Sequence, residues 1–249
     1  MNDVELTFLG TCGWYDSAAG NTVCALVRTP ECDIVLDAGN GLYKLSGYRL
    51  DRPVYLILSH FHLDHTEGLH TLCRSRFEKG LFICGPEGVG KYADILLDSP
   101  FSVKRLSLPF KTDIIELPGG ADLLPFGIKA LPMVHSDPVL GYRFLLRGKS
   151  LAFITDTGYC DNALALARGA DTLICECSHL PGEKNPGWPH FNPEEAAELA
   201  LNSGAGRLIM THFDSSRYPT AESRAAAVSA AKKIFANTVA AYDGMKIIL

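Results

Sequence analysis

The chain has 249 residues, 47% of them hydrophobic and 20% charged, and a formal net charge of −5. This composition is typical of a globular protein with a sizeable core, and no apolar stretch is long enough to span a membrane. The acidic balance, without a dense Lys/Arg run, excludes a global electrostatic footprint for nucleic acid.

The opening residues Met1 to Leu6 carry acidic side chains and lack the apolar core of a signal peptide, so we predict no targeting segment. The eight cysteines include no Cys-x-x-Cys pair, and several of them lie in apolar runs. We therefore predict free, buried thiols in a reducing cytoplasm.

The first part of the chain is predicted to be rich in strands. Alternating or continuous apolar runs, bounded by Gly, Pro or Asp, indicate each of them. In chain order the expected strands are 4–9, 22–29, 33–36, 54–58, 81–84, 114–117, 127–133 and a hairpin of 142–147 with 150–154. Helical segments are expected near 42–45, 66–73 and 87–97.

From residue 161 onward, helices and strands are expected to alternate. The expected helices are 161–168, 193–202 and 221–235, and the expected strands are 172–177, 208–210 and 246–249. Asn192-Pro193-Glu194-Glu195 indicates a helix start, because Asn192 can cap it and Glu195 stands at the capping-box position. Two packed sheets with helices outside would fit this order of elements.

Four side chains able to bind a metal fall within six residues, directly after the apolar run 54–58. His60 and His62 are two residues apart, so in extended backbone they point the same way and can hold one ion together. Asp64 and His65 follow after the chain turns, so they can face a second ion. Imidazole and carboxylate ligands suit Zn²⁺ and similar ions.

Three further His or Asp residues each stand just past the end of an apolar strand, namely His135, Asp156 and His212. With these residues the chain resembles the metallo-β-lactamase superfamily of metal-dependent hydrolases. The resemblance implies a four-layer αββα sandwich, and we predict a single domain over residues 1–249. It also implies two metal ions, one on His60, His62 and His135 and one on Asp64, His65 and His212, with Asp156 bridging them.

The expected metal is zinc, with manganese as the alternative. Two such ions would hold a bridging hydroxide as the nucleophile, and Asp64 could orient it while binding metal. The bridging carboxylate of Asp156 points to phosphate-ester chemistry, because β-lactamase-type members of the superfamily differ at this position.

A second resemblance is to ribonuclease Z and its small phosphodiesterase relatives. It rests on Leu173 to Glu176, on His190, and on Arg207 to Phe213. In that branch a Glu and a His outside the metal shell form a pair, and the His donates a proton to the leaving alkoxide. By position these residues are Glu176 and His190, and a carboxylate beside an imidazole keeps it protonated. The alternative is that these two side chains never meet.

The chain departs from ribonuclease Z between His135 and Asp156, where there is no room for the long tRNA-gripping arm of the nuclease. A small phosphodiester, such as a cyclic nucleotide, therefore fits better than nucleic acid as the substrate. The alternatives are a tRNA 3′ processing endonuclease, a thioester or lactone hydrolase, and a non-catalytic metal-bound sensor. No membrane partner is expected, and the resemblance leaves a homodimer open.

Candidate substrate-binding residues come from two loops. Asn21 and Thr22 stand roughly where the family has its phosphate-side loop, and Arg217 follows the last predicted ligand closely enough to contact a substrate phosphate. Trp188 and Tyr159 either line the substrate pocket or pack within their loops.

Overall fold

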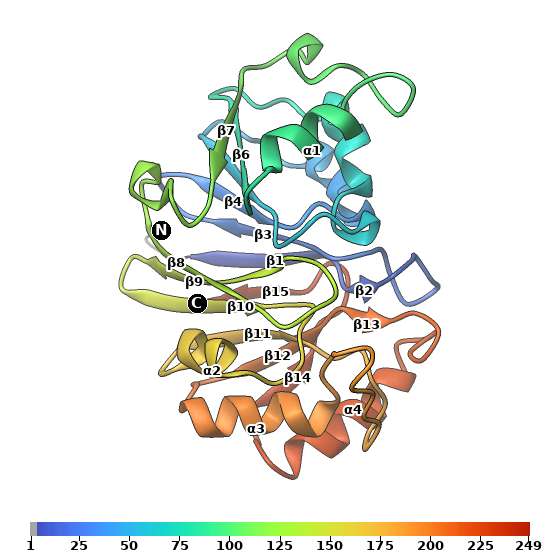
Figure 1. Ribbon diagram of the computed structural model, residues 1–249. Helices are drawn as coiled ribbons and strands as arrows, with labels where there is room; N and C mark the ends of the chain where they lie inside the picture. The colour runs from blue at the N-terminus through green and yellow to red at the C-terminus, as the bar shows by residue number, and fades with distance from the viewer. Residues whose placement is uncertain (1–3) are drawn as a thin grey trace.

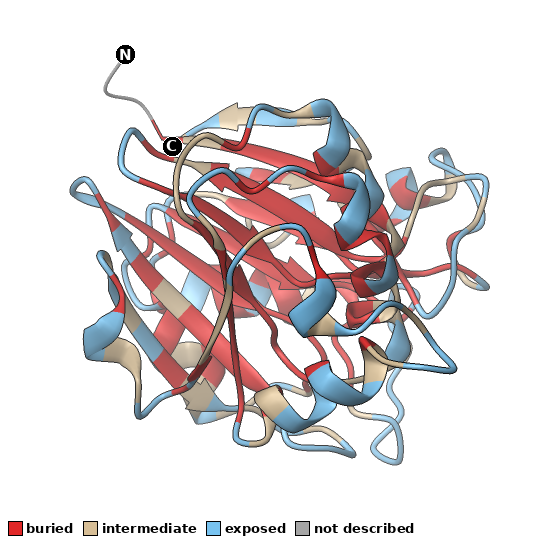
Figure 2. Ribbon diagram, turned by 90° about the horizontal axis from the view of Figure 1, so that it is seen from above, coloured by how far each residue is buried: buried red, intermediate tan, exposed pale blue. Residues whose placement is uncertain are grey.

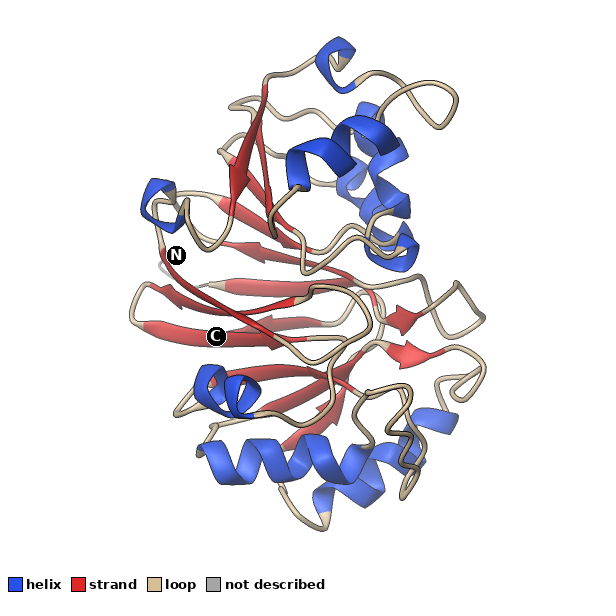
Figure 3. Cartoon of the chain, in the orientation of Figure 1, coloured by secondary structure: helices blue, strands red, loops and turns tan. Residues whose placement is uncertain are grey.

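The computed structural model describes residues 4–249, so the first three residues of the N-terminal stretch, for which we predict no targeting signal, lie outside the described residues. Strands fill the centre of the molecule and helices cover both outer sides (Figure 1, Figure 3). The layers follow the order helices, sheet, sheet, helices. The predicted αββα sandwich is therefore confirmed.

The first sheet has seven strands in the order β15-β1-β3-β4-β5-β6-β7. Their bounds are Glu5–Gly10 (β1), Cys24–Arg28 (β3), Asp33–Leu36 (β4), Val54–Ile57 (β5), Leu81–Gly85 (β6), Thr112–Glu116 (β7) and Lys246–Ile248 (β15). Strands β4, β5, β6 and β7 pair in parallel. Their carboxyl ends therefore lie along one edge of the sheet.

The second sheet has six strands in the order β14-β12-β11-β10-β9-β8. Their bounds are Gly127–Pro132 (β8), Leu140–Leu146 (β9), Lys149–Ile154 (β10), Thr172–Glu176 (β11), Leu208–Thr211 (β12) and Thr238–Ala240 (β14). Strands β10, β11, β12 and β14 pair in parallel. A separate parallel pair joins β2 (Cys12–Gly13) to β13 (Phe213–Asp214).

The helices divide between the two outer faces (Figure 1). Two 3₁₀ helices, η1 (Asn40–Gly47) and η3 (Glu67–Arg74), and α1 (Val89–Leu96) lie outside the first sheet. Three α-helices, α2 (Asp161–Ala167), α3 (Pro193–Ser203) and α4 (Ser223–Lys232), lie outside the second. Short 3₁₀ turns are η2 (Leu63–His65), η4 (Arg105–Ser107) and η5 (Ala121–Leu123). Asn192 caps α3 in a capping box with Glu195, as predicted.

Three hydrophobic clusters hold these layers together. Strand β10 shows the principle, because successive side chains point to opposite faces of a sheet. Leu151 and Phe153 belong to the cluster between the two sheets, whereas Ala152 and Ile154 pack toward the helices of the second sheet. Burial on both faces explains why the predicted strands are continuous apolar runs, and Figure 2 shows buried residues concentrated in these central strands.

The structure corrects the sequence-based expectations in a few places. Strand β14 and the short pair β2 and β13 have no counterpart among the predicted elements. All eight cysteines are free, but Cys73 is exposed and Cys160 is half-buried, so the prediction that the thiols are buried is wrong for these two. Within residues 4–249, no helix has the length and apolar character needed to cross a membrane.

Candidate metal centre

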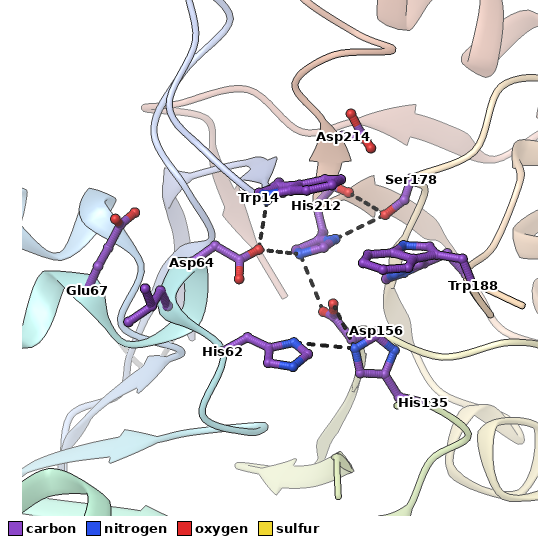
Figure 4. Close-up of a pocket in the computed structure, with 13 residues that line it drawn as sticks. Trp14, His62, Asp64, Glu67, His135, Asp156, Ser178, Trp188, His212 and Asp214 are labelled. Atoms are coloured by element: carbon purple, nitrogen blue, oxygen red, sulfur yellow. Dashed lines mark hydrogen bonds and ion pairs between the residues drawn. The ribbon is translucent and has the colours of Figure 1, made fainter. Parts of the chain in front are cut away.

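The predicted metal-binding residues meet at one edge of the sandwich, past the carboxyl ends of strands. The histidine-rich motif follows β5, Asp156 follows β10 and His212 follows β12. His135 lies in the loop after β8, which runs in the same direction as β10 because both strands pair antiparallel with β9. Loops at the carboxyl ends of parallel strands are where α/β folds bind ligands. Figure 4 shows His62, Asp64, His135, Asp156 and His212 facing one another.

His60, His62 and His135 form what we call the all-histidine cluster. One ring nitrogen of each residue lies within 4.8 Å of those of the other two. His135 Nε2 is 3.4 Å from His62 Nδ1 and 4.0 Å from Asp156 Oδ1. The three imidazoles thus converge on a point that the Asp156 carboxylate also approaches.

Asp64, His65 and His212 form the mixed cluster, and Asp156 completes it. His65 Nε2 lies 3.1 Å from His212 Nε2. From His65 Nε2, Asp156 Oδ2 is 3.0 Å away and Asp64 Oδ2 is 3.6 Å away. From His212 Nε2, Asp156 Oδ2 is 3.4 Å away and Asp64 Oδ2 is 3.3 Å away. A tetrahedral zinc site with metal–ligand distances of about 2.0–2.2 Å has ligand–ligand edges of about 3.3–3.6 Å. The mixed cluster has the dimensions of such a site.

The other ring nitrogen of most of these histidines is already in use. His65 Nδ1 lies 2.8 Å from Asp37 Oδ2, His62 Nε2 lies 2.9 Å from Asp137 Oδ2, His60 Nδ1 lies 3.0 Å from Ser59 Oγ, and His212 Nδ1 lies 3.1 Å from Ser178 Oγ. Such outer partners fix the ring orientation of metal-binding histidines. Each of these four rings therefore presents its remaining nitrogen to the cluster.

A divalent metal fits these donors. His60 Nε2 is buried and has no hydrogen-bond partner among the described residues, which is costly unless a lone pair there binds a ligand. Burial lowers the pKa of His60 well below its ordinary value, so its ring is neutral. Although burial opposes it, the nearby His65 holds the pKa of Asp64 below its ordinary range. Neutral imidazole and ionised carboxylate are the forms that bind metal, so His65, whose pKa is raised, against the effect of burial, by the neighbouring carboxylates, would release a proton on binding it.

Backbone strain is concentrated at this site. The residues other than glycine with positive φ, among those described, are Trp14, Asp37, Arg147, Asp156 and His212. Apart from Arg147, each is a cluster residue, bonds to a cluster residue, or lines the adjoining cavity. Such conformations cost about 1–3 kcal/mol each and tend to occur where function requires them.

Glu176 and His190 meet beside the clusters. His190 Nδ1 lies 2.8 Å from Glu176 Oε1, and both side chains are buried. The Thr157 amide donates to Glu176 Oε1 at 2.7 Å and the Ser178 hydroxyl to Oε2 at 2.8 Å, so the carboxylate is held in place from both sides. Although burial opposes it, the Glu176 carboxylate raises the pKa of His190 to about 9.

A cavity of about 450 Å³ opens onto both clusters. Members of the two clusters line it together with His190. Its remaining walls include Trp14, Trp188, Glu67 and Asp214. A small organic molecule fits a cavity of this size, which is within the usual range for ligand pockets.

The three predicted substrate-binding residues do not line this cavity. Thr22 Oγ1 donates to Glu67 at 2.6 Å, and Asn21 Nδ2 donates to Asp16 at 2.9 Å. The Arg217 guanidinium binds Glu183 and Asp214. Each of these side chains therefore has a partner within the protein. Their part in substrate binding stays a prediction. Tyr159 also lies outside the cavity lining.

Sequence reasoning missed Asp37, Asp137 and Trp14. Asp37 pairs with His65 from 28 positions away, and Asp137 pairs with His62 from 75 positions away. For Asp37 the sequence carries a weak signal, because it follows an apolar strand as the predicted ligands do. For Trp14 the signal is its place in the glycine-containing loop 10–20, next to Gly13.

Comparisons with known proteins bear on the family and the fold of this chain. The family model described as "Beta-lactamase superfamily domain" matches residues 33–213. The protein Rv1339 of Mycobacterium tuberculosis is 31% identical over 248 residues, which cover 93% of this chain and 87% of that protein. The crystal structure of YhfI from Bacillus subtilis, a metallo-β-lactamase fold protein, has a TM-score of 0.81 at 23% identity and covers 99% of this chain and 100% of YhfI.

A ribonuclease Z is also similar to this chain. The Geobacillus kaustophilus enzyme is 26% identical over an alignment of 304 positions, which covers 96% of this chain and 97% of the enzyme. Because the alignment is longer than the 249 residues of this chain, the ribonuclease contains residues that have no counterpart here.

Proposed function

The chain belongs to the β-lactamase superfamily, whose members are metal-dependent hydrolases, and from that premise we propose that it is a phosphodiesterase that uses two divalent metal ions, with zinc as the expected metal. The all-histidine cluster would hold one ion, the mixed cluster the other, and Asp156 would contact both. When bound, such ions lower the pKa of a water molecule and neutralise negative charge on phosphoryl oxygens.

The observation that carries the proposal is the Glu176–His190 pair at the cavity. Hydrolysis of a phosphodiester breaks a P–O bond, and the departing alkoxide must receive a proton. His190 lines the cavity beside the clusters, and its Nδ1 is tied to Glu176 at 2.8 Å. This leaves the Nε2 proton of a protonated His190 to pass to the leaving oxygen. Asp64, next to the same cavity, would orient the attacking water.

The test is hydrolysis of bis(p-nitrophenyl) phosphate by protein loaded with Zn²⁺ or Mn²⁺, with the bound metal quantified. We expect turnover by the native chain and loss of it in His62→Ala. The matched control is His70→Ala, because His70 is exposed and does not line the cavity. A chain that holds both metals and cleaves no diester, but does cleave a thioester or lactone, would contradict the proposal.

A leaving-group series tests the role of His190. His190→Ala should slow hydrolysis by about 10²- to 10⁴-fold for diesters with poor leaving groups. The loss should be much smaller for p-nitrophenolate, which leaves without a proton. Equal losses for good and poor leaving groups would remove the proton-donor role from His190.

The similarity to ribonuclease Z favours a second candidate, the processing of tRNA 3′ ends. The surplus length of that relative argues against it, because the added residues are absent from this chain. Cleavage of precursor tRNA with strong salt dependence would support the nuclease.

The proposal also takes residues 1–249 as one domain. The hydrophobic cluster between the sheets contains residues from both, including Phe8 and Ile57 of the first and Phe144 and Phe153 of the second.

A further inference from the structure

Both tryptophans of the chain lie at the cavity beside the metal clusters. The Trp14 and Trp188 rings stack with their centroids 5.6 Å apart and their planes 17° from parallel. They are nevertheless 60% and 46% exposed. Large apolar side chains left exposed in a cavity usually mark a binding surface. Figure 4 shows both indole rings beside His212, on the side of Asp64 away from Glu67.

The position of Trp14 is fixed by the metal centre itself. Its backbone has φ of 70°, a conformation that is unusual for a bulky residue. The Trp14 amide donates a 2.7 Å hydrogen bond to Asp64 Oδ2, which ties this strained turn to the mixed cluster. The preceding Gly13 lets the His212 ring lie against the backbone of this turn, because a Cβ there would lie 2.6 Å from His212 Cε1. The backbone of Trp14 is therefore anchored at the mixed cluster, and its ring lines the adjoining cavity.

Trp188 lies beside the proposed proton donor. Its ring centroid is 5.8 Å from that of His190. The backbone on either side is anchored, since the Trp188 amide donates to the Asn185 carbonyl at 3.0 Å and the Trp188 carbonyl lies 3.1 Å from His179 Nε2. The aromatic surface is therefore on the side of the cavity where the leaving oxygen would receive its proton.

We propose that Trp14 and Trp188 form a stacking platform for the nucleobase of the substrate, so that the diester cleaved here is a small nucleotide diester. This inference rests on the proposed phosphodiesterase function. Nucleobases stack on aromatic side chains through their π-faces, and the cavity volume suits a single nucleotide. The carboxylates of Glu67 and Asp214 line the same cavity and can accept hydrogen bonds from ribose hydroxyls or an exocyclic amino group.

Binding can be measured without turnover, because all tryptophan fluorescence of this chain comes from the platform. The metal-loaded protein is titrated with AMP and with ribose 5-phosphate, which keeps the sugar and phosphate and lacks the base. We expect AMP to quench the fluorescence and to bind at least tenfold more tightly than ribose 5-phosphate. Equal affinities would overturn the platform and would point to recognition of the sugar and phosphate alone.

Kinetics separate the two tryptophans from other aromatic residues. Trp14→Ala and Trp188→Ala should each lower kcat/KM for a 3′,5′-cyclic nucleotide by about 5- to 150-fold, the range expected for one lost base-stacking contact. The loss should appear mainly in KM, and Phe at either position should recover most of it. Both alanine variants keep the backbone amide of residue 14, which donates a hydrogen bond to Asp64. The matched control is Phe101→Ala, because Phe101 is 67% exposed and lies outside the cavity lining.

A diester without a base distinguishes failure of the platform from failure of the proposed function. Methyl riboside 3′,5′-cyclic phosphate keeps the ring diester and lacks the nucleobase. We expect it to be a poorer substrate than the cyclic nucleotide, with smaller losses in the tryptophan variants. If the native protein cleaves both equally well, the platform is wrong and the phosphodiesterase stands. If it binds AMP as expected but cleaves no diester at all, the proposed function fails.

Discussion

The all-histidine and mixed clusters present similar donors but are supported very differently. In the mixed cluster, His65 and its partner Asp37 are both fully buried. In the all-histidine cluster, the side chains of His62 and its partner Asp137 are 40% and 62% exposed. His135 Nδ1 has no partner among the described residues. Because a charge partner acts more strongly when it is buried, the mixed cluster should bind its metal more tightly.

The largest effect is expected at Asp156, which our proposal places in contact with the ions of both clusters. Asp156→Ala should leave fewer than two ions bound per chain. It should also lower diesterase activity by more than the loss of about 10- to 100-fold that removal of an outer partner causes. Metal content by elemental analysis and hydrolysis of bis(p-nitrophenyl) phosphate measure the two losses. Asp113→Ala is the control, since Asp113 lies on β7 and pairs with Lys111. A variant that kept two ions per chain would show that Asp156 does not connect the clusters.

The partners of the histidines give a matched pair of variants. Asp37→Asn should weaken metal binding by about 10- to 100-fold, because Asp37 is the partner that orients the His65 ring. Asp37 is itself held in place by the Ser59 amide, which donates to it at 2.6 Å, and by the Ser59 hydroxyl, which donates at 2.9 Å. Asp137→Asn should weaken it by less than about tenfold, since solvent screens this exposed pair. Competition with a chromophoric chelator gives both affinities. A larger effect at Asp137 would contradict the expectation that the mixed cluster binds its metal more tightly than the all-histidine cluster.

Stepwise metal release tests the same order in the native chain. A chelator should remove one equivalent of metal quickly, from the all-histidine cluster, and a second more slowly. His62→Ala should remove the fast phase and leave the slow one. Release of both equivalents in a single phase would mean that the clusters bind metal as one unit.

The smallest effect concerns a second carboxylate–imidazole pair. Glu176 and His190 are 2.8 Å apart, as are Asp37 and His65. In our proposal, however, His190 donates a proton to the leaving group, whereas His65 binds metal. Because the pKa of His190 is raised to about 9, hydrolysis of diesters with poor leaving groups should fall as the pH rises through that value. Glu176→Gln removes the charge that raises the pKa, so the alkaline limb should move toward the ordinary value of about 6.5. If the alkaline limb stays in place in this variant, the loss of activity at high pH is not caused by deprotonation of His190.

Local pattern predicted most of the fold. Strands such as β5 and β10 are buried on both faces, so they appear as apolar runs with clear ends. The helix after Asn192 carries its cap in four consecutive residues. The missed strands are short, and β2 and β13 have two residues each, which is too few for any periodic pattern. Strands β2 and β13 form because the segment before Trp14 pairs with the segment that follows His212.

The sequence by itself determined the donors, because His60 to His65 are consecutive on one loop and the later His and Asp residues follow apolar strands. Only the tertiary structure decided their surroundings. It paired Glu176 with His190 and Asp37 with His65, and it brought Trp14 to Trp188 across 174 positions of chain. The physical reason is that donor type is a property of one residue, whereas burial, pairing and stacking depend on which distant segments the two sheets bring together.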